Sequence, residues 1–312
     1  MTRWLTTLAL AAGFTTTASA VEGLQWDWSD GTEHRFLLRT DVQLAEVLWI
    51  HSDVGRQARV VGFALDVVTR CTGGEPAGRN GYNLTCVLED IALVIDEAPS
   101  EPGIMEGLAV EIDELYTGKP VEMVMKHDGR ITRFEVTGID QNNRRIDQFH
   151  QQFREMLRRA FATMEVRLPR KGSTRGGTDW REVGTMAMEF PSLLGTMGRA
   201  DVNLTITGVE DGQASVEVAA EGILGTGEMI TIGGVERPKN QYDMRMVGEA
   251  VFDTNAHHLV SQQYIATGTT TASSQLGEGQ SHAYRQRSEG RIIDANATVR
   301  LPDSGERVHA VE

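Results

Sequence analysis

The side chains that could support catalysis or bind a metal ion are few and scattered. His257 and His258 are the one adjacent pair of histidines, and no Asp, Glu or Cys stands beside them at a spacing suited to a shared metal ion. The acidic pair Asp96 and Glu97 lacks the alternate-residue spacing of a calcium loop. No nucleophile elbow, zinc-protease helix or phosphate-binding loop occurs. The sequence therefore predicts no metal and no cofactor, and it favours a protein without enzymatic activity.

Cys71 and Cys86 are the two cysteines of the chain, and they flank a loop rich in glycine. A pair so placed in an exported protein is typical of a disulfide that clamps a hairpin, whereas a metal site would need further soft ligands nearby. In the chain-entropy model, closing a loop of about 15 residues stabilises the fold by about 3 kcal/mol. We therefore predict a disulfide between these two residues.

The first twenty residues have the composition of a signal peptide. Arg3 precedes an apolar run from Trp4 to Phe14, and Ala18-Ser19-Ala20 supplies the small residues that signal peptidase accepts. The run is too short for a permanent anchor, and no later segment approaches 18 uninterrupted apolar residues. We expect an exported protein, periplasmic or extracellular, with no transmembrane segment after cleavage. A formal net charge of −14 argues against a nucleic-acid partner, because nucleic-acid binding depends on phosphate neutralisation by Lys and Arg.

The elements that must position any site are one helix and two β-rich flanks. Residues 140–170 contain the longest segment with a helical period, and a helix is predicted over about 144–166 between the capping residue Asn143 and the helix breaker Pro169. Its apolar stripe carries a large, soft set of side chains that could line a ligand, and the alternative is plain filling of the core: Phe149, Phe153, Met156, Leu157 and Phe161.

The opposite face of this helix is basic. Residues 144–175 hold nine Lys or Arg and three Asp or Glu. Arg154, Arg158 and Arg159 could form a docking surface for an acidic protein partner, and the alternative is a simple solvated helix face.

Both flanks are predicted to be strands separated by turns. Residues 21–139 form the N-terminal β half with the disulfide hairpin, and residues 171–312 form the C-terminal β half, ending in a strand region at 282–301. Residues 108–116 fit a short helix or a strand. The shared strand, turn, strand order of 121–138 and 244–268 suggests a duplication. The fold class is therefore mainly β (α+β), a curved antiparallel sheet or half-barrel with one long amphipathic helix packed on it.

A resemblance to known families rests on four short segments. These are Gly248 to Asp253, Leu259 to Gln262, Leu168-Pro169, and Gly177 to Trp180. On them the chain resembles uncharacterised families of secreted bacterial β proteins, whose layout is similar to that of periplasmic lipoprotein-carrier half-barrels. The resemblance implies a curved sheet plugged by helices around an apolar cavity, and it transfers no functional residue.

Together these features favour an exported, non-enzymatic binding protein that encloses an apolar, lipid-like ligand. The alternative is an interaction or structural protein of the cell envelope that contacts its partner with the sheet and the basic helix face.

Overall fold

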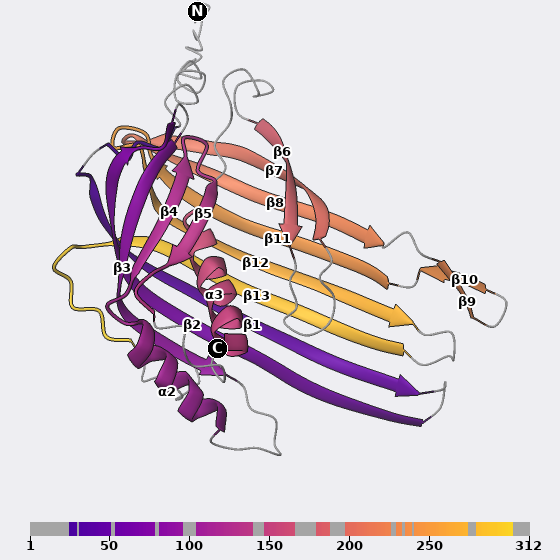
Figure 1. Cartoon of the computed structure of the whole chain (residues 1–312). Coiled ribbons are helices and arrows are strands. Elements are labelled where there is room, and N and C mark those ends of the chain that lie inside the picture. Colours follow the sequence, from indigo (N-terminus) through magenta and orange to yellow (C-terminus); the bar gives the residue numbers. More distant parts are fainter. Residues whose placement is uncertain are drawn as a thin grey trace, which may run out of the picture.

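The structure is a computed structural model of the chain, drawn in Figure 1. It describes residues 25–29, 31–50, 54–78, 81–95, 104–139, 147–165, 179–187, 197–225, 229–232, 235–238, 240–273 and 279–301. The predicted signal peptide, residues 1–20, lies outside this part of the chain. So do the segments 140–146 and 171–178 that flank the helical region in the sequence.

In the described part of the chain, one antiparallel sheet of eleven strands dominates, which confirms the mainly β prediction. Its strand order is β5-β4-β3-β2-β1-β13-β12-β11-β8-β7-β6, and a small separate sheet pairs β10 with β9. The strands are β1 (Glu33–Ile50), β2 (Val54–Pro76), β3 (Gly81–Ile95), β4 (Pro120–Lys126), β5 (Ile131–Val136), β6 (Asp179–Ala187), β7 (Met197–Glu210), β8 (Gln213–Gly225), β9 (Met229–Ile232), β10 (Val235–Pro238), β11 (Asn240–Asp253), β12 (His258–Ser273) and β13 (Gly279–Ile293).

The two β halves of the sequence share this sheet. The N-terminal half supplies β5 to β1, and the C-terminal half supplies β13 to β6. They meet where β1 pairs with β13 in an antiparallel register that sets Phe36 opposite Ile292 and Thr40 opposite Ser288. The continuous ladder makes the junction part of the sheet, so the first and last strands of the chain lie side by side at its centre (Figure 1).

Two helices are described. Helix α2 (Ile104–Tyr116) packs on β3, which settles the open choice between helix and strand for residues 108–116. Helix α3 (Asp147–Ala162) contacts β1, β2 and β13 at the middle of the sheet and also β5 at its edge. A helix can touch both the centre and the edge only if the sheet curls around it, and Figure 1 shows α3 lying across the curved strands.

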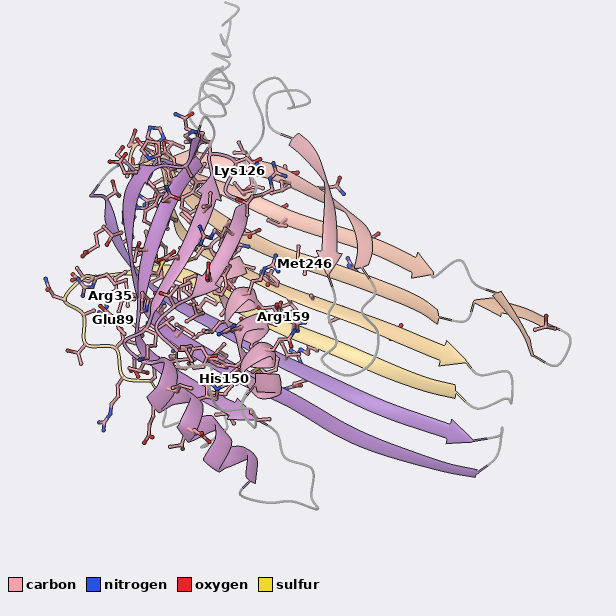
Figure 2. The ribbon with its side chains drawn as sticks, in the orientation of Figure 1. Arg35, Glu89, Lys126, His150, Arg159 and Met246 are labelled. Atoms are coloured by element: carbon pink, nitrogen blue, oxygen red, sulfur yellow. A yellow bond between two sulfur atoms is a disulfide. The ribbon has the colours of Figure 1, made fainter. Side chains whose placement is uncertain are left out.

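The two faces of the sheet differ because side chains alternate along each strand. The inner face carries the main core, with Phe36, Leu65, Leu88 and Phe252 fully or almost fully buried. The outer face carries charged side chains in pairs; Arg35, for example, lies with its Nε 2.5 Å from Glu89 Oε2 (Figure 2).

The chain leaves the sheet earlier than the sequence predicts at its C-terminal end. The predicted strand region 282–301 is wrong beyond Ile293, where β13 ends. Asp294 starts a turn, since its side chain accepts a hydrogen bond from the backbone nitrogen of Asn296 at 2.7 Å and its carbonyl oxygen accepts one from Ala297 at 3.1 Å. The segment then covers part of the outer face, where Leu301 packs near Leu37.

The segment of residues 25–29 ties together two turns that are far apart in the strand order. The backbone nitrogen of Trp26 donates to the carbonyl oxygen of His127, in the turn between β4 and β5, at 3.2 Å. The backbone nitrogen of Asp27 donates to the carbonyl oxygen of His257, in the turn between β11 and β12, at 3.0 Å. Gly73 permits this path, because a Cβ there would lie 2.8 Å from the carbonyl oxygen of Trp28. This clasp holds one end of the curled sheet together.

Cys71 and Cys86 form the predicted disulfide. They lie directly opposite each other in the register of β2 and β3, and both are fully buried. The bridge therefore fixes the hairpin whose strands lead to the central strand β1. Neither helix in the described ranges is long and apolar enough to cross a membrane.

Candidate ligand-binding site beside helix α3

Helix α3 places its apolar stripe against the inner face of the sheet. Phe153, Leu157 and Phe161 are fully buried, and Met156 is 8% exposed. All four belong to the main core, while Phe149 lies in α3 but its side chain is outside the described part of the structure. The structure thus brings the described members of the predicted ligand-lining set together on one buried face. Their role toward a ligand stays a prediction.

Aromatic contacts fix the rotation of α3. The ring of Phe153 meets that of Tyr116 on α2 edge to face, with centroids 4.5 Å apart, and the ring of Phe161 meets Phe134 on β5 in the same way at 5.2 Å. The hydroxyl of Tyr116 also lies 2.9 Å from Nδ1 of His150. Two turns of the helix are therefore held by rings from two other elements.

The C-terminal end of α3 rests directly on the sheet. The sequence predicts a helix end near residue 166, but α3 ends at Ala162. Beyond it the chain forms tighter turns, in which the backbone nitrogens of Thr163, Met164 and Glu165 each donate a hydrogen bond to the carbonyl oxygen three residues earlier. A Cβ on Gly290 would lie 2.6 Å from Oγ1 of Thr163, so only glycine allows this approach to β13. Beside it, Glu165 Oε1 accepts a hydrogen bond from the backbone nitrogen of Ile131 at 3.1 Å.

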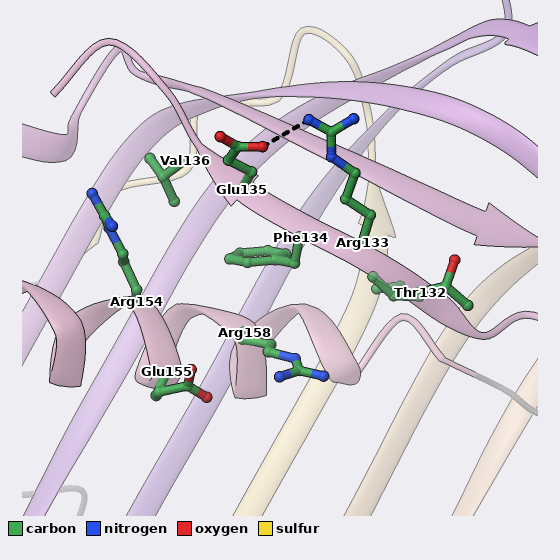
Figure 3. Close-up of a pocket in the computed structure, with 9 residues that line it drawn as sticks. Thr132, Arg133, Phe134, Glu135, Val136, Arg154, Glu155 and Arg158 are labelled. Carbon is green, nitrogen blue, oxygen red and sulfur yellow. Dashed lines mark hydrogen bonds and ion pairs between the residues drawn. The ribbon is translucent and has the colours of Figure 1, made fainter. Parts of the chain in front are cut away.

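A pocket of about 300 Å³ lies between α3 and the edge strand β5 (Figure 3). Strand β5 contributes six residues and α3 contributes three: Ile131, Thr132, Arg133, Phe134, Glu135, Val136, Arg154, Glu155 and Arg158. In Figure 3 the ring of Phe134 lies between strand and helix, with Arg154 toward one end of the pocket and Arg158 toward the other. The pocket thus combines a short apolar wall with an excess of guanidinium groups.

The three arginines predicted to form one docking face do not share one environment. Arg154 and Arg158, four residues apart, line the pocket, whereas Arg159 is half-buried and acts electrostatically on Tyr264 of β12. Arg154 lies near the hydroxyl of Tyr116 and acts on it electrostatically. Burial raises the pKa of Tyr116, and the neighbouring charge of Arg154 opposes that rise. Binding of an acidic protein by this face stays a prediction.

A chain of buried polar side chains crosses the inner face beside α3. Gln286 Nε2 donates to the hydroxyl of Tyr264 at 3.1 Å and to Oγ of Ser288 at 2.8 Å, and Ser288 Oγ donates to Oγ1 of Thr40 at 3.4 Å. Burial raises the pKa of Tyr264, which keeps its hydroxyl protonated. These residues satisfy one another, so the inner face contains a polar strip within its apolar layer.

Sequence reasoning missed the part of the site that β5 contributes. Arg133 and Phe134 stand in a six-residue strand whose alternation shows which positions share a face but not what they oppose. The one available signal was the Asp128-Gly129 turn, which predicts that β5 folds back along β4; Gly129 has the left-handed φ of 85° that such a turn requires. Nothing local indicates that α3 lies beside it.

Histidines meet at the clasped end of the sheet. The rings of His34 and His258 lie with centroids 4.4 Å apart, while His257 occupies the turn before β12. Within the described ranges, no group of three or more His, Cys, Asp or Glu side chains is placed to hold a metal ion.

Comparison with known proteins places the chain in no family. No protein-family model matches the chain, and no curated protein matches it. Among solved structures, the chain is similar to one concerned with lipid–protein interactions in lipovitellin, with 10% sequence identity and a TM-score of 0.42. The match covers 89% of this chain and 27% of the lipovitellin chain, so the chain spans about a quarter of the length of the protein that it matches.

Proposed function

We propose that the protein is an exported, non-enzymatic binding protein whose curled sheet and helix α3 hold an apolar, lipid-like ligand. The inner face of the C-terminal strands would form the main wall of the binding space, and α3 would border it. The predicted signal peptide and the disulfide Cys71–Cys86 support export, because disulfides persist in oxidising compartments.

The apolar inner face of β7, β8 and β11 carries this proposal. Leu204, Ile206, Val216 and Phe252 are buried on this face, whereas Val218 of β8 is only half-buried. Among the described residues, the main helix contacts are those of α3 with β1, β2, β13 and β5 and of α2 with β3. Met246 of β11, half-buried, lies on the sheet beyond α3 (Figure 2). A concave apolar surface on which some side chains remain partly exposed is the kind of surface that takes a small apolar molecule.

Binding of the neutral fluorescent probe N-phenyl-1-naphthylamine tests the proposal. We expect its fluorescence to rise on addition of the folded protein and to fall when a neutral long-chain competitor is added. We also expect Met246→Asp to weaken binding, because a carboxylate would be placed on the apolar face. Gln213→Asp, at an exposed position of β8, is the control. Probe binding that survives Met246→Asp unchanged would place the ligand elsewhere, and no binding at all would reject the function.

A second candidate function is supported by the outer face. Val247 and Ile265 are 45% and 40% exposed and lie opposite each other on β11 and β12. They line a shallow groove of about 430 Å³ together with Glu217, Glu249 and Arg287. An exposed apolar pair rimmed by charges is typical of a protein interface, which favours a partner protein in the cell envelope.

Co-purification from the native envelope distinguishes this second candidate. We expect a stoichiometric partner to be lost from Val247→Lys and kept by Gln213→Lys, since only the first substitution charges the groove. Equal recovery from both variants would remove the outer face from consideration.

A further inference from the structure

The pocket between α3 and β5 contains arginine charge that the described protein groups leave incompletely paired. Arg133 is paired, with Nη2 at 2.7 Å from Glu135 Oε2 and 3.8 Å from Glu122 Oε2. Among the described residues, Arg158 makes no ion pair, and the buried Nε of Arg154 has no hydrogen-bond partner. A buried donor without a partner costs free energy, and so does a like-charge pair four residues apart on a helix.

The residues around these two arginines indicate which kind of ligand could pair with their charge. Three arginines and two glutamates line the pocket, which leaves an excess of one positive charge. Guanidinium groups match the planar oxygens of a carboxylate or the oxygens of a phosphate, and they bind them with two hydrogen bonds at a time. Ile131, Phe134 and Val136 place apolar surface beside the charges. The pocket therefore suits one acidic group attached to an apolar body.

We infer that Arg158 binds the phosphate or carboxylate group of an anionic amphiphile whose apolar chain begins against Phe134, while Arg154 adds positive charge from the other end of the pocket. The inference rests on the proposed function, because it assigns the acidic end of the ligand that the sheet and α3 are proposed to hold. The same chemistry would also bind a free phosphate ion, and the experiment separates these two sources.

Isothermal titration calorimetry with three probes below their micellar concentrations separates head-group from chain recognition. The probes are dodecyl phosphate, the uncharged tetraethylene glycol monododecyl ether, and inorganic phosphate. We expect dodecyl phosphate to bind at least about tenfold more tightly than the ether, since a charge-assisted bidentate contact contributes on that scale. Of the two chain-bearing probes, only the phosphate ester should bind more weakly when salt is added. Inorganic phosphate should bind far more weakly than the ester, because it lacks the chain.

Substitutions at Arg158 assign the effect to the pocket. Arg158→Gln should weaken the binding of dodecyl phosphate by about tenfold and leave the binding of the ether unchanged, since the exposed side chain contributes charge and not packing. Arg158→Lys should recover part of the loss because it keeps the charge. The matched control is Arg285→Gln, another exposed arginine, on the outer face of β13. It should leave all three affinities unchanged.

The outcomes separate this inference from the proposed function. Equal affinity for the ester and the ether, or equal losses in Arg158→Gln and Arg285→Gln, would overturn the anion site and leave the apolar binding function standing. Binding of inorganic phosphate as tight as the ester, with no binding of the ether, would support an anion site for a free ion and reject the apolar function. No binding of any probe would overturn both.

Discussion

The hydroxyl oxygen of Tyr116 lies 2.9 Å from Nδ1 of His150 and joins α2 to α3 inside the core. Both residues are buried, and the Tyr116 ring packs on Phe153 next to them. Because α2 is fixed on β3 and α3 crosses the middle of the sheet, this contact sets where α3 lies relative to the N-terminal strands. It therefore also positions Arg154, the next residue after Phe153, at the pocket.

Tyr116→Phe isolates the contribution of this hydroxyl. The ring contact with Phe153 remains, but His150 loses its buried hydrogen-bond partner. We expect the free energy of unfolding, measured by urea denaturation, to fall by about 1 to 3 kcal/mol. Thr117→Ala removes an exposed hydroxyl one residue later and should change the free energy of unfolding by no more than about 0.5 kcal/mol. Equal effects of the two substitutions would show that the Tyr116 hydroxyl does not stabilise the helix pair.

Phe153→Ala measures how tightly the stripe of α3 is packed. The side chain is fully buried and in ring contact with Tyr116, so we expect a loss of about 3 to 5 kcal/mol in the same assay. A clearly smaller loss would mean that space already exists beside the ring, and the ligand would then lie directly beneath α3 at this position.

The disulfide makes a separate prediction about the N-terminal half. Cys71→Ser should lower the free energy of unfolding by about 2 to 4 kcal/mol, because the unfolded chain regains the entropy of the opened loop. Thiol labelling of the unfolded, unreduced wild-type protein should give no label. Two labels per chain would show that the bridge does not form in the purified protein.

His34 predicts a pH dependence of stability. Its burial, together with the charge of His258, lowers its pKa to about 4, while Glu33 acts weakly in the opposite direction. Between about pH 6.5, the pKa of an unfolded histidine, and about pH 4, the unfolded chain binds a proton that the folded protein excludes. His34 therefore makes the unfolding free energy fall as the pH is lowered through this window. Above it, His34 contributes no slope.

The His34→Gln variant tests the assignment, since carboxylates also titrate in acid. We expect its unfolding free energy to depend less steeply on pH within this window than that of the wild type, and His258→Gln should raise the His34 pKa in an NMR titration. Identical pH profiles for wild type and His34→Gln would show that His34 does not exclude its proton in the folded state.

Local patterns in the sequence predict the elements better than their assembly. The four-residue spacing of Phe153, Leu157 and Phe161 predicts the buried face of α3, because residues four apart on a helix share a face whatever the rest of the chain does. The pairing of β1 with β13 joins residues about as far apart as Phe36 and Ile292, and no local pattern encodes such a partner. The pocket depends on that assembly, so Arg154 and Arg158 were predictable as basic residues of a helix face and their placement opposite β5 was not.

The two boundaries that the sequence misplaced have different causes, one local and one between distant residues. The strand ends before Asp294 because the side chain of Asp294 accepts a hydrogen bond from the backbone nitrogen of Asn296 and so stabilises a turn. The last turn of α3 tightens where Thr163 meets Gly290, a contact between residues that are distant in the sequence. Both ends depend on hydrogen bonds and close approaches, which hydropathy does not register.

Native mass spectrometry of the protein purified from the organism that makes it tests the binding function most directly. The account predicts a fraction of molecules that carry one additional small mass, which organic extraction releases and identifies as an acidic, chain-bearing molecule. The mass should be lost or reduced in Met246→Asp. Protein whose mass equals that of the processed, disulfide-bonded chain alone, and which takes up no amphiphile when one is supplied, would contradict it.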